Sequence, residues 1–225
     1  MEILFPQAFF NVALFEYPEL FPEDPVWEAI RRLPEFVERL FSSAAVQRVP
    51  FWQYALYESQ RIHIEGRVAV GEGTVIYPGA YLGDGVVIGR HCIIGQNVTI
   101  RGPVIISDSC VVGPCGEVSH SVFFPEARAA HKNFVGHSII GCRVNLGAGA
   151  ETANWKLDGS EIGLWVDQER VQTGLTKLGA VVGDGGSVGG NSVFNPGALL
   201  GKDCRIGPLV SVPNRSFPDG TVLKG

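Results

Sequence analysis

The five histidines are the side chains best suited to move protons, because an unperturbed imidazole titrates at about pH 6.5. His131 and His137 lie in the segment AHKNFVGHSI, residues 130–139, where the sequence loses a regular period. Catalytic bases are often held where a regular scaffold is interrupted, so these two are candidate general bases. His63 and His91 fall before the pattern or at a regular corner of it, and we expect both at the surface.

The five cysteines carry weaker signals for catalysis or metal binding. Cys92, Cys110 and Cys204 fall in small apolar positions of the pattern, where a thiol packs as a small buried group. Cys115 and Cys142 lie near expected corners without a neighbouring base, so we expect neither to be a nucleophile. There is no zinc-binding spacing, and an odd number of thiols fits a reducing cytoplasm better than a disulfide scaffold.

A repeat of six residues is the pattern that must position these side chains. From Ile64 to Val118 an aliphatic residue recurs at every sixth position, and Phe124 continues the frame. The period returns from Val182 to Val212. A period of six with two inward positions fits neither an α-helix nor a simple alternating strand. It fits short strands joined by tight corners, three to a coil of about 18 residues.

The sequence therefore predicts a mainly β fold, a left-handed parallel β-helix of hexapeptide repeats. Its hand follows from recognising the repeat, since the usual crossover rule favours the opposite sense. We expect the β-helix at residues 61–213, an N-terminal extension with a helical cap at 1–60, and a tail at 214–225. Residues 22–41 are interpreted as a short helical pair, bent near Pro34, that covers the open end of the β-helix.

One polar segment with two tryptophans, residues 152–177, interrupts the period. Loops of this length without their own pattern are uncommon in regular folds and often carry function. The sequence therefore predicts a protruding loop that takes part in the function of the β-helix.

Composition excludes several classes of protein. With 45% hydrophobic and 18% charged residues the chain can bury a large core, which excludes a disordered chain. A formal net charge of −5 argues against nucleic-acid binding, which needs a basic face. No apolar run is long enough to span a membrane, and the N-terminus lacks a basic region and a cleavage site, so we expect a cytoplasmic protein without membrane contact.

Three short motifs, in order along the chain, resemble the acetyltransferase half of the bifunctional glucosamine-1-phosphate N-acetyltransferase/UDP-N-acetylglucosamine pyrophosphorylase family: HKNFVG (131–136), VNLGAG (144–149) and TAN (152–154). The family pattern is similar to K-A-G-H-x-x-Y-x-G, then VNIGAGT, then T-x-N. The intervals from His131 to Asn145 and on to Asn154 match it without gaps, and the likeness extends over about residues 70–212.

This resemblance implies an acetyl-CoA-dependent N-acetyltransferase acting on an amino sugar or its 1-phosphate. Acetyl-CoA would be the co-substrate, and no metal is needed for acetyl transfer. Relatives are trimers with active sites between subunits, so we expect a homotrimer and a loop at 152–177 that reaches the next subunit. Some 60 residues precede the repeat, too few for a nucleotidyltransferase domain, which a separate protein could supply.

The resemblance also implies a role for each matching residue. His131 is the general base that takes a proton from the acceptor's ammonium group. The backbone N–H of Ala148 steadies the acetyl oxygen, and Asn154 holds the cofactor or acetyl group. Asn145 would bind the sugar, Arg101 would bind its phosphate, and Glu117 would line the same substrate pocket. Gly190 and Pro208 would contact the pantetheine arm of the cofactor.

Two positions depart from the family pattern at the substrate site. Ser119 stands where the family has a substrate-binding lysine, and Phe134 where it has a tyrosine. A lost charged hydrogen bond weakens binding by about 1.5–3 kcal/mol, so glucosamine-1-phosphate is less secure as the acceptor than acetyl transfer is as the reaction. Other cations could replace the lost contact, namely His120, Arg128, Lys132 or Lys156.

Three alternatives remain open at this point. One is an acyltransferase that takes a longer chain from acyl carrier protein. Another is a non-catalytic assembly module that has kept the scaffold, because a fold alone does not establish function. A third is a hydro-lyase of the γ-carbonic anhydrase type, with a metal held by His120, His131 and His137 across subunits.

Overall fold

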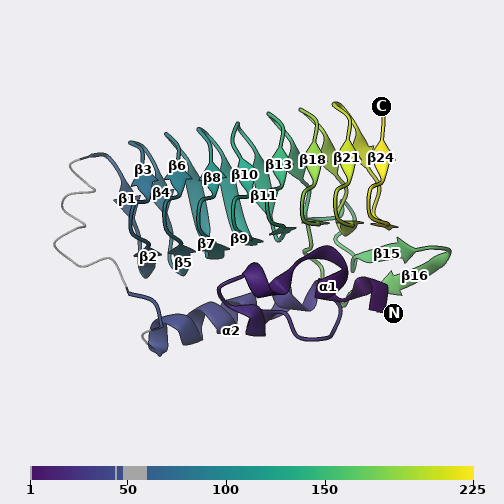
Figure 1. Cartoon of the computed structure of the whole chain (residues 1–225), viewed down its shortest axis with the longest axis horizontal. Helices are drawn as coiled ribbons and strands as arrows, with labels where there is room; N and C mark the ends of the chain where they lie inside the picture. Colours follow the sequence, from purple (N-terminus) through teal and green to yellow (C-terminus); the bar gives the residue numbers. More distant parts are fainter. Residues whose placement is uncertain (1, 44, 48–59) are drawn as a thin grey trace.

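The computed structural model describes residues 2–43, 45–47 and 60–225 and confirms the predicted mainly β, β-helical fold (Figure 1). Each coil contributes one short strand to each of three faces, and equivalent strands of successive coils pair in parallel. The coils stack because every strand then satisfies its backbone hydrogen bonds with the coils on both sides.

The strands fall into three columns, which we call faces 1, 2 and 3. Face 1 holds β1 (His63–Ile64), β4 (Tyr81–Leu82), the first part of β7 (Thr99–Ile106) and of β9 (Glu117–Phe123), β11 (Phe134–Gly136), β14 (Glu151–Thr152), β19 (Val193–Phe194) and β22 (Ser211–Val212). Face 2 holds β2 (Val68–Val70), β5 (Val86–Ile88), the rest of β7 and β9, β12 (Ile139–Ile140), β17 (Ala180–Val182), β20 (Ala198–Leu200) and β23 (Ser216–Phe217). Face 3 holds β3 (Val75–Ile76), β6 (Ile93–Ile94), β8 (Val111–Val112), β10 (Arg128–Ala129), β13 (Asn145–Leu146), β18 (Ser187–Val188), β21 (Arg205–Ile206) and β24 (Val222–Leu223).

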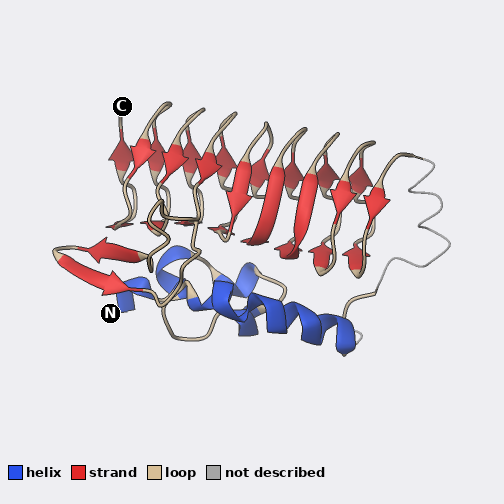
Figure 2. Cartoon of the chain, turned by 180° about the vertical axis from the view of Figure 1, so that it is seen from behind, coloured by secondary structure: helices blue, strands red, loops and turns tan. Residues whose placement is uncertain are grey.

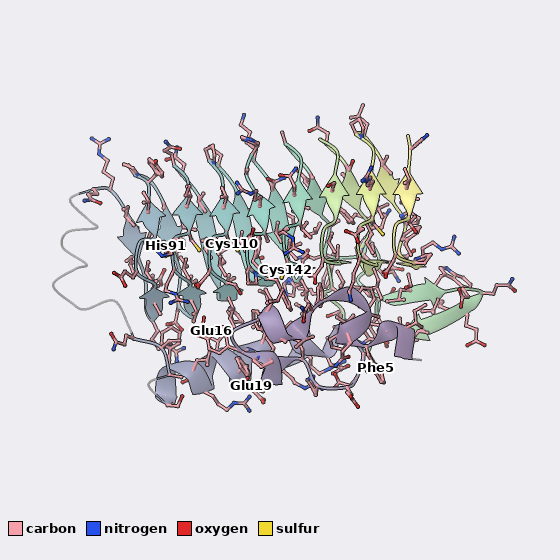
Figure 3. The ribbon with its side chains drawn as sticks, in the orientation of Figure 1. Phe5, Glu16, Glu19, His91, Cys110 and Cys142 are labelled. Atoms are coloured by element: carbon pink, nitrogen blue, oxygen red, sulfur yellow. The ribbon has the colours of Figure 1, made fainter. Side chains whose placement is uncertain are left out.

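The aliphatic repeat fills the interior of the β-helix, as the sequence predicts. The inward column includes Leu82, Ile100 and Val118, which are essentially without exposed surface. The three cysteines predicted in small inward positions are fully buried, and His63 and His91 are exposed, also as predicted. Figure 3 labels His91 and Cys110 on coils of the β-helix.

The coils are not all of equal length, and this corrects the expected frame. Thr99 pairs with Glu117, 18 residues later, whereas Glu117 pairs with Phe134 after 17. Phe123 therefore takes the inward place expected for Phe124, and Phe124 packs outside the β-helix against phenylalanines of the N-terminal segment. Compared with the 18-residue coils, the corner after β11 is one residue shorter, and so is the corner within β9. The loss of period at 130–139 is therefore preceded by an equal loss within β9.

The N-terminal segment covers face 2 along its length, so the expectation that it covers the open end is wrong. It contains α1 (Pro6–Phe9), α2 (Glu28–Ser42) and three short 3₁₀ turns at Glu2–Leu4, Val12–Leu14 and Pro18–Leu20. Figure 2 shows its helices running beside the strands. The outward side chains of face 2 are buried against it in one apolar cluster: Ala69, Val87, Ile105, Val122, Ile139, Val181 and Leu199. Apolar outward positions need such a cover because their exposure to water is unfavourable.

The structure corrects two other expected boundaries. Residues 28–42 form one helix with Pro34 inside it, in place of the bent pair. The expected tail at 214–225 is the last coil, because β23 pairs with β20 and β24 pairs with β21. No helix within the described ranges is long and apolar enough to cross a membrane.

The interruption at 152–177 forms the antiparallel hairpin of β15 (Gly163–Val166) and β16 (Glu169–Gln172), which projects from the coils (Figure 1). Ile162 and Leu164 anchor it in the apolar cluster beneath the N-terminal segment. Trp155 remains half-exposed, and Leu157 is fully exposed. The predicted protruding loop is thus confirmed. The hairpin is anchored by buried apolar side chains, and the first residues of the insertion are exposed.

Leu33→Ala is expected to destabilise the protein by about 2–5 kcal/mol, because Leu33 is fully buried between α2 and the β-helix and its loss leaves a cavity. Glu35→Ala on the exposed side of the same helix is the matched control and should change stability by less than about 0.5 kcal/mol. Urea unfolding monitored by circular dichroism measures both. Equal effects of the two variants would show that α2 does not pack on face 2.

Candidate active site

Four predicted site residues occupy the same corner position in four successive coils, between faces 3 and 1. We call this column, formed by His131, Ala148, Gly190 and Pro208, the His131 edge. In each corner the next residue donates its N–H to the carbonyl one coil earlier: Gly149 to His131 at 2.9 Å, Asn191 to Ala148 at 2.8 Å and Leu209 to Gly190 at 3.0 Å. Neighbouring strands lie about 4.8 Å apart, so the edge extends over roughly 14 Å.

Asn133 couples the two corners that carry His131 and Ala148, and sequence reasoning gave it no role. Its side chain is 3% exposed. Its Oδ1 accepts the His131 N–H at 3.0 Å, and its Nδ2 donates to the carbonyls of Gly147 at 2.8 Å and Ala150 at 3.1 Å. These three bonds hold the corner at 131 against the corner at 147–150. A polar residue two positions after the histidine was the only signal for it in the sequence.

The chemistry available at this edge is that of a base beside a hydrogen-bond donor. The His131 side chain is exposed. Ala148, one coil away, is also exposed, and none of the described carbonyls accepts a hydrogen bond from its N–H. A backbone donor left free in this way can bind an oxygen on which negative charge develops. The edge therefore carries an exposed imidazole and a free backbone donor on neighbouring coils, two groups that an acyl transfer could use.

Polar side chains flank the His131 edge on both adjoining faces. On face 1, Phe134 pairs in register with Glu117 on the coil before it, and both point outward. Arg101, on the strand before that, forms an ion pair with Glu117, and both side chains are substantially exposed. On face 3, Asn145 is exposed on β13 and pairs with Arg128. The structure thus gathers Phe134, Glu117 and Asn145 around the edge, with Arg101 farther along face 1.

Ser119 lies deeper than its neighbours, with 9% of its surface exposed. It is paired in register with Arg101 and with Gly136 on the adjacent coils. Ser119 therefore belongs to the same surface as Arg101. Its short uncharged side chain cannot supply the cation that the family pattern has at this position.

Asn154 is not brought to the His131 edge within one chain. It lies past the end of β14, at the corner between faces 1 and 2, on the far side of face 1 from His131. There its side-chain Nδ2 lies 2.9 Å from Nδ1 of His137. The structure therefore separates the predicted catalytic set into two corners, with His131 and Ala148 at one and Asn154 with His137 at the other.

Two stacked histidines occupy this second corner, which we call the His137 corner. The rings of His120 and His137 lie 4.5 Å apart between centroids, with 5° between their planes. Burial, the neighbouring His120 ring and the charges of Lys177 and Arg101 lower the pKa of His137 to about 4. Burial is also the main cause that lowers the pKa of His120, with Lys177 adding to it.

Both imidazoles are consequently neutral at neutral pH, and this links stability to pH. A folded pKa below the ordinary value of about 6.5 means that the unfolded chain binds the proton more readily. The stabilisation from a neutral His137 is complete above about pH 6.5 and is lost progressively as the pH falls toward 4.

Among the residues that the structure describes, no group of three or more histidine, cysteine, aspartate or glutamate side chains could hold a metal ion. His120 and His137 face each other ring to ring, and His131 lies at a different corner. Of the cysteines, Cys115 alone is exposed, and burial raises the pKa of Cys142 to about 12. Cys142, expected near a corner, is buried on the side of the β-helix that the N-terminal segment covers (Figure 3).

Comparison with known proteins agrees with the repeat and with the motifs. The family described as bacterial transferase hexapeptide (six repeats) matches residues 67–102. A bifunctional sugar-1-phosphate nucleotidylyltransferase/acetyltransferase of Sulfurisphaera tokodaii is 32% identical over 180 residues, which are 80% of this chain and 45% of that protein. A bifunctional protein GlmU of Methanococcus aeolicus is 28% identical over 73% of this chain and 40% of its own length.

The chain thus spans less than half the length of these two bifunctional relatives. A protein of more similar length is a putative uncharacterized acetyltransferase of Escherichia coli K12, YaiX, which is 32% identical over 69% of this chain and 67% of its own length. With coils, motifs and relatives in agreement, the chain belongs to the hexapeptide-repeat acyltransferase family.

Proposed function

We propose that this protein is an acetyl-CoA-dependent N-acetyltransferase whose acceptor is an amino sugar or an amino-sugar 1-phosphate, with His131 as the general base. The observation that carries the proposal is the His131 edge, where an exposed imidazole lies one coil from the free N–H of Ala148. The corners of Gly190 and Pro208 continue the edge as a path for an extended cofactor. Relatives named as acetyltransferases support the same reaction.

In the proposed reaction, His131 takes a proton from the ammonium group of the acceptor, which frees the nitrogen lone pair. The amine then attacks the carbonyl carbon of the acetyl thioester and forms a C–N bond. The Ala148 N–H stabilises the oxyanion of the tetrahedral intermediate. The C–S bond breaks, the sulfur leaves as a thiolate and takes the proton from the imidazolium, and the attacking nitrogen releases its second proton to solvent. The products are the N-acetylated acceptor and free CoA.

The surroundings of the edge favour a polar, partly anionic acceptor. Asn145 and Glu117 offer hydrogen bonds to hydroxyl groups from the two adjoining faces. Arg101 is exposed on face 1, where its planar fork suits a phosphate once it is released from Glu117. The exposed Arg101 in this position supports the 1-phosphate as the better substrate, with the uncharged Ser119 and Phe134 on the same face.

Separation of Asn154 from His131 within one chain favours a shared site between chains of a homotrimer. Asn154, at the start of the insertion, would then face the His131 edge of a neighbour, with the exposed Trp155 and Leu157 beside it. A closed ring of identical contacts completes one such site for each chain.

His131→Ala should lower kcat for acetyl transfer by about 10²–10⁴-fold, because general-base catalysis contributes that much. The measurement is CoA release from acetyl-CoA with a panel of amino sugars and their 1-phosphates. His91→Ala is the matched control, since His91 is an exposed histidine at another corner of the β-helix. Equal rates in the two variants would refute the role of His131. Turnover only with an acyl-carrier-protein thioester, or with no thioester, would instead favour the alternative donor or a binding module.

Phe134→Tyr should lower KM for the phosphorylated acceptor by about two- to tenfold, because a new hydroxyl beside Glu117 adds one hydrogen bond worth about 0.5–1.5 kcal/mol. The same variant assayed with the unphosphorylated sugar provides the control. An identical change in KM for both acceptors would mean that Phe134 does not face the phosphate.

Mixed assemblies of His131→Ala and Asn154→Ala chains test the shared site. Each variant alone should be inactive, whereas random mixing in equal amounts should restore about one quarter of wild-type activity, since a site needs one intact residue from each neighbour. Chains are unfolded together, refolded and assayed, with each variant refolded alone for comparison. Absence of recovery from assemblies shown to be mixed would place both residues in a site made by one chain.

A further inference from the structure

The stacked histidines of the His137 corner have no part in the reaction derived above, yet they are held at both ends by hydrogen bonds. At one end, Nε2 of His120 lies 2.9 Å from the carbonyl oxygen of Ile30 in α2. Only a protonated ring nitrogen can donate to a carbonyl, so this nitrogen carries the hydrogen. At the other end, Nδ1 of His137 accepts from Nδ2 of Asn154 at 2.9 Å. A chain of contacts thus connects the Ile30 carbonyl of α2, the two stacked imidazole rings and the Asn154 side chain.

Backbone geometry explains why these two side chains meet. Both residues have positive φ, 48° for His120 and 50° for His137, at the two corners that lack one residue. The His137 N–H donates to the carbonyl of Ser119 at 2.9 Å, which sets one ring above the other. The pair is thus a consequence of shortened coils at this height of the β-helix, and coils of full length elsewhere do not repeat it.

Buried hydroxyl groups make the base of this corner rigid. Ser138 Oγ donates to the carbonyl of Gly136 at 2.8 Å and lies 2.9 Å from Thr152 Oγ1. The Gly136 N–H donates to the same Thr152 oxygen at 3.0 Å. Both side chains are at most 1% exposed. A buried network in which every polar group is hydrogen-bonded restricts the conformations of the neighbouring residues. Asn154 is one of these neighbours, since it lies two positions after Thr152.

The charges around the rings come from three elements. Lys177, at the end of the insertion, stands over the ring of Trp155 at 5.7 Å, and Arg101 belongs to β7. Arg31 of α2 is paired with Glu28 and donates to the carbonyl of Thr173 at 2.8 Å. Arg31 and Lys177 line a cavity of about 330 Å³ beside the two histidines. The charge of Lys177 opposes protonation of both rings, and the charge of Arg101 adds to this for His137.

We infer that His120 and His137 are positioning residues for Asn154: the stack holds the Asn154 amide with Nδ2 toward His137, so that its Oδ1 is presented to the reacting groups. The inference rests on the proposed function, in which Asn154 contacts the acetyl group. A free amide could flip between two orientations, and only one of them offers a donor to the unprotonated Nδ1 of His137. Protonation of Nδ1 would remove that acceptor and release the amide.

The kinetic test is a double-mutant cycle between His137 and Asn154. His137→Ala should lower kcat/KM for acetyl-CoA by about tenfold, the value of one lost hydrogen bond to a reacting unit. In an Asn154→Ala background the same change should have little further effect. His137→Asn should recover most of the loss, since its amide oxygen can accept in the place of Nδ1 and asparagine tolerates positive φ. His91→Ala is the control for loss of an imidazole at a corner.

Nitrogen NMR of the histidine rings gives a readout independent of activity. In the wild type at pH 7, His137 should show a neutral ring with hydrogen on Nε2 and a hydrogen-bonded Nδ1, and the Nδ1 signal should shift in Asn154→Ala. The inference is overturned if this signal does not move, if His137→Ala is as active as His91→Ala, or if the two losses in the cycle multiply. If Asn154→Ala itself leaves transfer unchanged, the proposed function fails at this residue, and the NMR result still tests the hydrogen bond.

Discussion

The coil-to-coil hydrogen bond at each corner is the interaction on which the rest of the structure depends. Residues such as Gly149 take a left-handed backbone there and donate to the corner one coil earlier, so positions 17, 18 or 42 residues apart become neighbours. A side chain added at Gly149 would lie 2.2 Å from Oδ1 of Asn191, which leaves no room for one. Because the corners stack in register, His131, Ala148, Gly190 and Pro208 form one continuous edge, although the last residue lies 77 positions after the first in the sequence.

Two corners of the β-helix are each one residue shorter than in an 18-residue coil, and this affects both the packing of the N-terminal segment and the corner of Asn154. It turns Phe124 outward, where it stacks on Phe10 and Phe15 and helps to bind the N-terminal segment to face 2. It also brings His120 and His137 into contact beneath α2. The same irregularity therefore links the covering helix to the corner of Asn154. In the proposed trimer that corner serves a neighbouring chain, so the packing of α2 and acetyl transfer would depend on one another through a few hydrogen bonds.

Much of the fold could be predicted from the sequence, because the period of six determines which side chains point inward and which corners align. The period does not indicate the site residues His131, Asn145 and Asn154, which were predicted from the resemblance of their motifs to a known family. Runs of three apolar residues such as those at 68–70, 86–88 and 180–182 signalled a face buried on both sides, but they do not say which segment covers it. The separation of Asn154 from His131 and the stack at His137 depend on three-dimensional corners, which a list of spacings does not contain. Ser216 to Leu223 also continue the coils, although the period followed in the sequence ends at Val212.

A crystal structure of the protein with bound CoA tests the central claim most directly. The account predicts that the pantetheine arm follows the corners of Pro208, Gly190 and Ala148, and that the sulfur lies within about 4 Å of the Ala148 N–H and on the side of His131. Asn154 of a neighbouring chain should approach the same end of the cofactor. A cofactor bound along another edge, or with its sulfur at the corner of His137, would contradict the assignment of the His131 edge as the site of acetyl transfer.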